Sequence, residues 1–202
     1  MDSEYTSHVG GVLLKNLADY VMIVDDCLTK ETCDSLIHKF DNAEDLILSN
    51  HSWEQDYRSF KELNLTTHPE FEEEQQMFYD ISKELYRFYE KKCGIDFFPK
   101  HYGFEDVRMK RYDNNDQDQF GWHTDVGDYQ SARRYLVMFY YLNDVEEGGQ
   151  TAFNDKINDN YLTIQPKQGR IVMFPPMWMY PHIGMKPISN PKYIISTYAH
   201  YL

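Results

Sequence analysis

At residues 119–125 the chain reads Gln119-Phe120-Gly121-Trp122-His123-Thr124-Asp125, which places an imidazole and a carboxylate two residues apart. Residues i and i+2 of an extended strand point to the same face. His123 and Asp125 are therefore expected to bind one metal ion from one strand end, and the later His182 can complete the set. Two imidazoles and one carboxylate leave three coordination positions open, as in non-haem Fe(II) sites.

Length and charge limit the possible functions. A chain of 202 residues fits one domain. The net charge of −13 argues against a nucleic-acid-binding protein, which needs clustered Lys and Arg to bind phosphates. The acidic surface either attracts a basic peptide or simply keeps the protein soluble. Seventeen Tyr and twelve Phe favour strands and aromatic-lined pockets.

The cysteines and the N-terminus indicate a compartment. Cys27, Cys33 and Cys93 form no CxxC motif and cannot all pair, so a reducing environment is expected. The start Met1-Asp2-Ser3-Glu4 is acidic and lacks an apolar signal core, and no stretch has transmembrane length. We expect a cytoplasmic protein without a membrane partner, and the sequence does not indicate an oligomeric state.

The first half of the chain predicts helices. A strand is expected over residues 20–24 and an amphipathic helix over 29–41. Thr67-His68-Pro69-Glu70 has the spacing of a capping box and predicts the start of a second helix that ends at Gly94. Residues 1–19 and 43–66 show no clear pattern.

The second half of the chain predicts strands. Expected strands cover 107–112, 134–142, 151–153, 161–165, 170–174 and 193–200, separated by turns at 148–149, 166–169 and 189–191. Many short strands without intervening helices point to a β-sandwich or barrel. We expect a mainly β fold in one domain over 1–202, in which 1–105 is a helical and strand support and 106–202 is the catalytic core.

The order of motifs in the second half carries a family resemblance. It runs Tyr112, His123, Asp125, Tyr141-Leu142-Asn143, Gly148-Gly149-Gln150-Thr151-Ala152-Phe153, His182 and Lys192. Over residues 107–200 this resembles the prolyl 4-hydroxylase-like branch of the Fe(II)- and 2-oxoglutarate-dependent dioxygenases. The resemblance implies a double-stranded β-helix (a jelly roll, cupin-like) and the use of Fe(II), 2-oxoglutarate and O₂, with ascorbate as a reductant.

The resemblance also implies residue roles. His123, Asp125 and His182 match the iron ligands, and Lys192 matches the base that receives the far carboxylate of 2-oxoglutarate. A buried carboxylate needs such a fixed cation. Each residue has a structural alternative. His123 and Asp125 could form an ordinary surface turn, His182 could be a packed histidine, and Lys192 could be a surface lysine.

Further pocket residues follow from the same resemblance. Tyr141, Thr151 and Tyr112 match residues that contact the cosubstrate, and Ser196 and Tyr198 lie on the strand that follows Lys192. Plain core packing is the alternative for the three cosubstrate contacts. Relatives often carry a glycine in the loop before His-x-Asp, whereas residues 113–119 contain none. Asn and Asp also tolerate left-handed geometry, so the turn can form without glycine.

The implied activity is hydroxylation of a C–H bond, with succinate and CO₂ as co-products. A prolyl residue of a peptide or protein is the expected substrate, and a small molecule, a lysine or a nucleobase is the alternative. A non-catalytic jelly-roll binding module would need a broken triad, and a zinc hydrolase has no need of Lys192. Loops 126–132 and 154–160 are expected to select the substrate, with 127–131 as a mobile lid.

Overall fold

The computed structural model describes residues 17–52, 57–155 and 160–202. Within them, strands form one 12-stranded antiparallel sheet. The strands are β1 (Met22–Val24), β2 (Leu48–Ser52), β3 (Arg58–Asn64), β4 (Tyr102–Phe104), β5 (Arg108–Tyr112), β6 (Gln119–His123), β7 (Arg134–Tyr141), β8 (Thr151–Asp155), β9 (Asn160–Ile164), β10 (Ile171–Phe174), β11 (His182–Gly184) and β12 (Lys192–Tyr201). The helices are α1 (Lys30–Asp41) and α2 (Glu72–Cys93), with short 3₁₀ turns at Leu17–Tyr20, Glu44–Leu46, Leu65–Thr67, Pro69–Phe71 and Ser131–Arg133.

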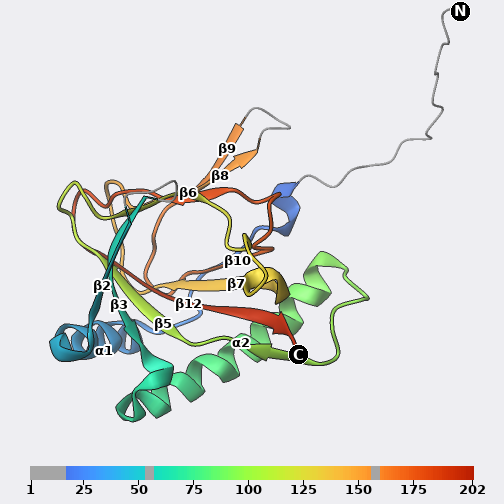
Figure 1. The fold of residues 1–202 in the computed structure, drawn as a ribbon, viewed down its shortest axis with the longest axis horizontal. Helices are drawn as coiled ribbons and strands as arrows, with labels where there is room; N and C mark the ends of the chain where they lie inside the picture. Colours follow the sequence, from blue (N-terminus) through green and yellow to red (C-terminus); the bar gives the residue numbers. More distant parts are fainter. Residues whose placement is uncertain (1–16, 53–56, 156–159) are drawn as a thin grey trace, which may run out of the picture.

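The sheet curls on itself. Its strand order is β1-β10-β7-β12-β5-β3-β6-β11-β8-β9, while β2 pairs with β3 and β4 with β12. Figure 1 shows β6 and β8 facing β7 and β12 across the interior of the molecule. This is the double-stranded β-helix expected from the sequence, and β3 joins its two halves by pairing with both β5 and β6.

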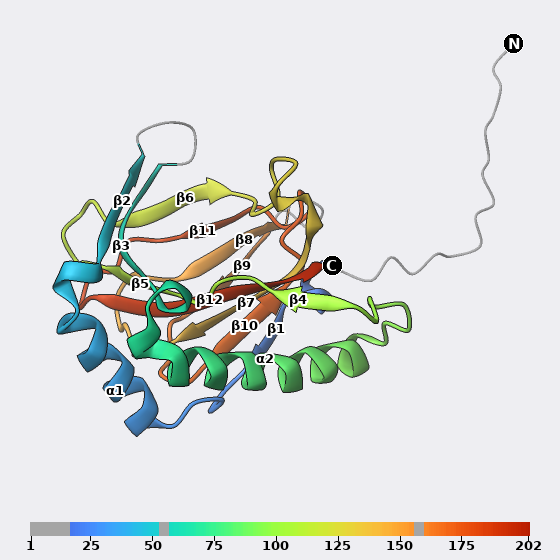
Figure 2. The same cartoon turned by 60° about the horizontal axis from the view of Figure 1, so that its bottom comes forward.

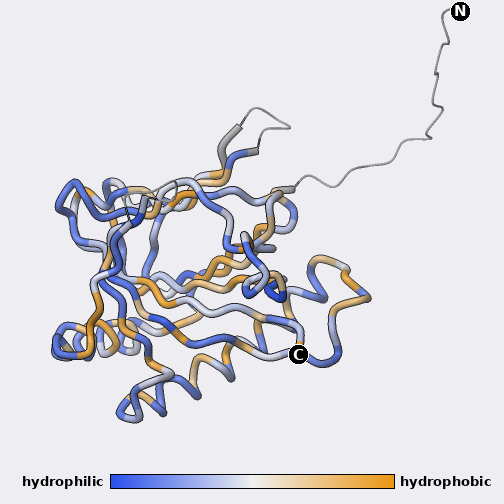
Figure 3. Tube along the Cα trace, viewed as in Figure 1, coloured by the Kyte–Doolittle hydropathy of each residue, from blue (hydrophilic) through white to orange (hydrophobic). Residues whose placement is uncertain are grey.

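Both helices pack on the outside of the half formed by β7, β12 and β5, as Figure 2 shows for α2. Strand β7 alternates between two cores because successive side chains point to opposite faces. Leu136, Met138 and Tyr140 contact the core under the helices, whereas Val137, Phe139 and Tyr141 face the interior of the curled sheet. Hydrophobic residues likewise recur at intervals along α2, and its buried side chains are Phe78, Ser82, Tyr86, Tyr89 and Cys93 (Figure 3).

The helix boundaries only partly follow the prediction. Thr29 caps α1 by accepting a hydrogen bond from the Thr32 amide at 3.2 Å, as the expected helix over 29–41 requires. The predicted capping box at Thr67 is wrong, because α2 begins at Glu72 and the Thr67 hydroxyl donates to the Asn64 carbonyl instead. Two 3₁₀ turns occupy this stretch, the second starting at Pro69. The C-terminal stop is confirmed, since Gly94 ends α2 with φ of 63°.

Strands β2, β3 and β4 lie where the sequence showed no clear pattern or no predicted strand. The β2–β3 hairpin spans Leu48–Asn64, and β3 supplies the central link of the sheet. The predicted strand over 20–24 is shorter, since Tyr20 belongs to a 3₁₀ turn. No helix in the described residues is long and apolar enough to cross a membrane.

Candidate metal and cosubstrate site

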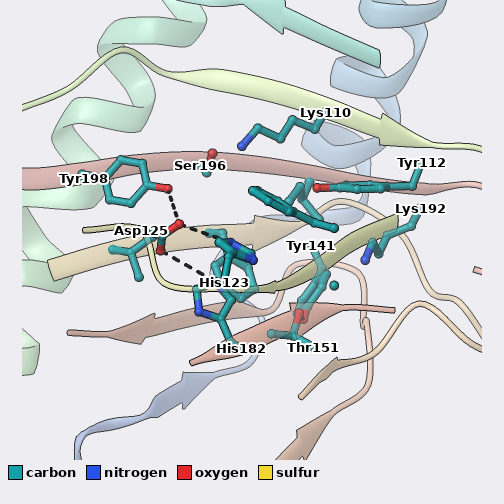
Figure 4. A pocket seen from close by; sticks show the side chains of 15 residues that line it. Lys110, Tyr112, His123, Asp125, Tyr141, Thr151, His182, Lys192, Ser196 and Tyr198 are labelled. Carbon is teal, nitrogen blue, oxygen red and sulfur yellow. Dashed lines mark hydrogen bonds and ion pairs between the residues drawn. The ribbon is translucent and has the colours of Figure 1, made fainter. Parts of the chain in front are cut away.

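Three possible metal donors meet inside the mouth of the curled sheet. His123 is the last residue of β6 and pairs directly with His182, the first residue of β11, while Asp125 lies two residues after His123. One possible ligand atom of each residue lies within 4.8 Å of the others. The Nε2 atom of His123 is 3.4 Å from Oδ1 of Asp125, and that of His182 is 3.7 Å from Oδ2 (Figure 4).

Backbone carbonyls orient both imidazoles. Nδ1 of His123 is 2.7 Å from the Gly121 carbonyl oxygen, and Nδ1 of His182 is 3.1 Å from that of Tyr180. A carbonyl can only accept, so each Nδ1 carries the proton and each Nε2 presents a lone pair to the centre. Burial lowers the pKa of His182 to about 4. This imidazole is therefore neutral at pH 7, as a metal ligand must be.

The two carboxylate oxygens of Asp125 differ in their hydrogen bonding. Its Oδ1 accepts a hydrogen bond from the Tyr198 hydroxyl at 3.1 Å, whereas its buried Oδ2 has no hydrogen-bond partner among the described residues. Burial by itself would raise the pKa of this carboxyl, but His182 and His123 hold it below its usual range. Arg134 Nη1 also donates to the Asp125 carbonyl oxygen at 3.0 Å. An ionised, oriented carboxylate with a free buried oxygen fits a metal ligand.

Lys192 forms a second unusual feature of the same cavity. Its side chain is buried, with 2% of the residue exposed, and Nζ donates to the Gly149 carbonyl oxygen at 3.1 Å. The amine also lies 4.5 Å from the centre of the Tyr112 ring. No carboxylate of the described residues pairs with it, and burial lowers its pKa to about 7. A buried cation without an anion fits the far carboxylate of a dicarboxylic acid.

The other expected residues line this cavity as well. Tyr141 donates from its hydroxyl to the Thr151 hydroxyl at 2.7 Å beside Lys192. Lys192, Ile194, Ser196 and Tyr198 share one face of β12, since every second residue of a strand points the same way. The structure thus brings all the side chains proposed from the sequence to one cavity: Tyr112, His123, Asp125, Tyr141, Thr151, His182, Lys192, Ser196 and Tyr198.

Six residues that line the cavity were not proposed from the sequence: Lys110, Phe120, Val137, Phe139, Gly184 and Ile194. Phe120 stacks on His123, with ring centres 3.5 Å apart and planes 8° from parallel. Lys110 on β5 lines the cavity. It also lines a groove outside the cavity, whose walls include Arg58, Glu62 and Arg134. The alternation over 107–112 could have indicated Lys110, because it places this charge on the same face as Tyr112.

The loop before the triad closes without glycine. Asp116 adopts the left-handed conformation, with φ of 61°, as expected for this loop. Asp118 is buried and accepts from the Ser59 hydroxyl at 2.7 Å and from the Asp113 amide at 2.9 Å.

The loop expected to act as a lid is a hydrogen-bonded turn in the structure. The Asp128 carboxylate accepts from the amide and the hydroxyl of Ser131. A lid motion of 127–131 stays a prediction, and residues 156–159 of the other proposed loop lie outside the described residues.

The sequence of the second half matches a known family. Residues 107–200 match the model described as "2OG-Fe(II) oxygenase superfamily". No curated protein sequence matches the chain significantly.

Solved structures share the fold. A viral collagen prolyl hydroxylase from Paramecium bursaria Chlorella virus-1, in complex with 2-oxoglutarate, has a TM-score of 0.65 at 21% identity, over 91% of this chain and 97% of the other. A prolyl-4-hydroxylase from Pseudomonas putida has a TM-score of 0.65 at 13% identity, over 91% and 93%. A prolyl hydroxylase from Trichoplax adhaerens, in complex with a hypoxia-inducible factor peptide, has a TM-score of 0.69 at 15% identity, over 90% of this chain and 84% of the other. Residues 107–200 thus match a family of oxygenases that use Fe(II) and 2-oxoglutarate, the His123–Asp125–His182 triad fits the iron site of such an enzyme, and the solved structures share the fold of the chain.

Proposed function

We propose that the protein is an Fe(II)- and 2-oxoglutarate-dependent dioxygenase that hydroxylates a prolyl residue of a peptide or protein at the site formed by the His123–Asp125–His182 triad and Lys192. The observation that carries the assignment of a 2-oxoglutarate-dependent site is Lys192, which is buried without a carboxylate partner among the described residues and lies in the same cavity as the three donors. We also propose that residues 1–202 act as one domain, because β3 from the first half pairs with β5 and β6 of the second.

The triad would hold Fe(II) through Nε2 of each imidazole and the carboxylate of Asp125. The Gly121 and Tyr180 carbonyls fix the two rings, and the Tyr198 hydroxyl fixes Asp125. These three ligands leave coordination positions for the cosubstrate and O₂. Because the orienting partners are already in place, the ligands need little rearrangement on metal binding.

Lys192 and the Tyr141–Thr151 pair would receive 2-oxoglutarate. The ammonium group of Lys192 would bind the far carboxylate, and the hydroxyl groups next to it would supply further hydrogen bonds. Tyr112 would cover the lysine through its ring. When bound, the metal and 2-oxoglutarate would supply the oxidation, which consumes O₂ and converts the cosubstrate to succinate and CO₂ while one oxygen atom enters the substrate. Ascorbate as a reductant stays a prediction.

Apolar side chains of the chain would exclude water from the reacting atoms. Val137, Phe139 and Ile194 line the same cavity as Lys192 and the triad, and Phe120 stacks on the His123 ring. A water-poor site strengthens electrostatic contacts and limits side reactions.

The prolyl substrate is supported by the structural likeness. The three structures compared above are each described as prolyl hydroxylases, and one contains a peptide. Identities of 13–21% leave a small molecule, a lysine or a nucleobase as the alternative substrate.

The test is substrate-stimulated consumption of 2-oxoglutarate by the Fe(II)-loaded protein. Proline-containing peptides, lysine peptides, free metabolites and nucleosides would be screened in parallel, with mass spectrometry to detect the gain of one oxygen atom. We expect stimulation and oxygen gain on a prolyl residue. Oxygen gain only on another class would refute the prolyl assignment, and no metal-dependent consumption at all would refute the proposed site.

A further inference from the structure

We infer that the groove beside the metal site selects a substrate that carries a carboxylate close to the hydroxylated carbon, and that Lys110 and Ser196 bind this carboxylate. This inference rests on the proposed function, since it concerns the primary substrate of the same site. The carboxylate belongs to an acidic side chain next to the target residue in a peptide.

The groove lacks the excess negative charge of the chain as a whole, which carries −13. Its walls bring together the cations Arg58, Arg108, Lys110 and Arg134. The carboxylates in the same walls are Glu62, Glu105, Asp106 and Asp125, so one cation is in excess when Asp125 is taken up by a metal ion. A groove of this kind in an otherwise acidic chain admits an anionic group at the mouth of the site.

Lys110 lacks a close counter-ion. Its side chain is 12% exposed, and its nearest paired carboxylate oxygen, Oε2 of Glu62, lies 3.9 Å away, outside hydrogen-bond distance. The other oxygen of Glu62 already accepts from Arg108 at 2.8 Å. Burial lowers the pKa of Lys110, which shows that its ammonium form is incompletely compensated.

Ser196 supplies an independent second observation. Its hydroxyl oxygen is buried and has no hydrogen-bond partner among the described residues, although the side chain lines the cavity. Strand register places Lys110 opposite Ile194, two residues from Ser196 on the same face of β12. Figure 4 shows the Lys110 amine directed towards Ser196 above the triad. An ammonium and a hydroxyl that face the same cavity can bind the two oxygens of one carboxylate.

Arg58 favours a peptide over a free amino acid. Its Nε atom is buried without a hydrogen-bond partner, and no ion pair is formed by its guanidinium within the described residues. Arg58 and Glu62 lie on the same face of β3, four residues or roughly 13 Å apart along the strand, and Glu62 pairs with Lys110 across the sheet. A second anionic group at this distance requires an extended chain.

The test compares acids with their amides. Short peptides with one proline and a Glu at one of the flanking positions, or Gln in its place, would be titrated into protein loaded with Mn(II) and an unreactive 2-oxoglutarate analogue, with fluorescence anisotropy as readout. L-Proline and prolinamide would be compared by calorimetry. Lys110→Met removes the charge at similar volume. Lys61→Met is the matched control, because Lys61 precedes Glu62 on β3, points to the opposite face and pairs with Asp113 at 3.2 Å.

We expect at least one Glu peptide to bind about ten- to a hundredfold more tightly than its Gln counterpart, and Lys110→Met to abolish this preference. Lys61→Met should retain it. A preference for L-proline over prolinamide without any peptide preference would assign the carboxylate to a free amino acid and overturn the peptide source.

Three results would overturn the inference. The first is that no acid binds more tightly than its amide, and the second is that the Lys110→Met and Lys61→Met variants bind the peptides alike. The third is that Lys110→Met raises the 2-oxoglutarate requirement and leaves peptide binding unchanged. Metal-dependent 2-oxoglutarate consumption by the wild-type protein, measured alongside, separates these outcomes from a failure of the proposed function.

Discussion

Replacing Lys192 by Met should raise the free energy of unfolding of the protein without metal or cosubstrate. The same substitution should lower the affinity for 2-oxoglutarate. The lysine pKa falls from 10.5 to about 7, which corresponds to a burial cost on the order of 5 kcal/mol at neutral pH. Met fills a similar volume without a charge. Recovery of only ~1 kcal/mol of this cost would raise Tm by about 2–4 °C for a chain of this size.

The same substitution removes the partner of the far carboxylate. A hydrogen bond to a charged group contributes about 1.5–3 kcal/mol, so 2-oxoglutarate affinity should fall roughly ten- to hundredfold. The assay combines thermal unfolding of the metal-free protein with calorimetric titration of 2-oxoglutarate into the Mn(II)-loaded protein. Lys192→Ala is the companion variant, which should lose the same affinity but gain less stability because it leaves a cavity. A lower Tm for Lys192→Met together with unchanged 2-oxoglutarate affinity would refute this reasoning.

Asp125→Ala should abolish Fe(II) binding in calorimetry and 2-oxoglutarate turnover together, and retained metal binding would show that another residue is the ligand. Tyr198→Phe removes the hydrogen bond to Asp125 and should weaken Fe(II) binding about tenfold or more with little change in Tm; an unchanged affinity would contradict an orienting role. Gly148→Ala should lower the free energy of unfolding in urea by about 1–3 kcal/mol, because φ is 74° and the new Cβ would meet a backbone carbonyl. Gly127→Ala, with nothing within 4 Å, is its control, and equal losses would contradict the steric argument. Between pH 7 and 10.5 the unfolded chain binds more protons at Lys192 than the folded one, so wild-type stability should gain a rising contribution with pH that Lys192→Met lacks. Identical pH profiles would contradict the lowered pKa of this lysine.

The sequence predicted those elements whose local residue pattern matches their burial in the fold. The two-residue spacing of His123 and Asp125 was enough to predict that both donors lie together, whereas the place of Lys192 was implied by the family resemblance. Strand β7 was predicted because its eight residues are mostly aromatic or apolar, since it is covered on both faces.

Other features depend on contacts that sequence patterns do not show. The residues of β2 and β3 are mostly exposed or half-buried, and β3 carries charged side chains that line the groove. Hydrophobic and polar residues therefore do not alternate regularly along these two strands. The start of α2 was misplaced because Pro69 supports a 3₁₀ turn as readily as a first helical turn. The alternation over 107–112 places Lys110 on the same face as Tyr112, but its neighbours on β3 and β12 are distant in sequence and could not be predicted from this local pattern.

Strand β12 limits which changes in length the site can accept. The face that carries Lys192, Ile194, Ser196 and Tyr198 serves cosubstrate anchoring at one end and metal orientation at the other. A shift of the whole strand by one residue in its pairing would turn all four side chains outward together. A change in length is therefore expected to disturb both ends of the site at once. The edge strand β2 lies beside the groove and carries none of these four side chains, so its sequence can vary without moving them.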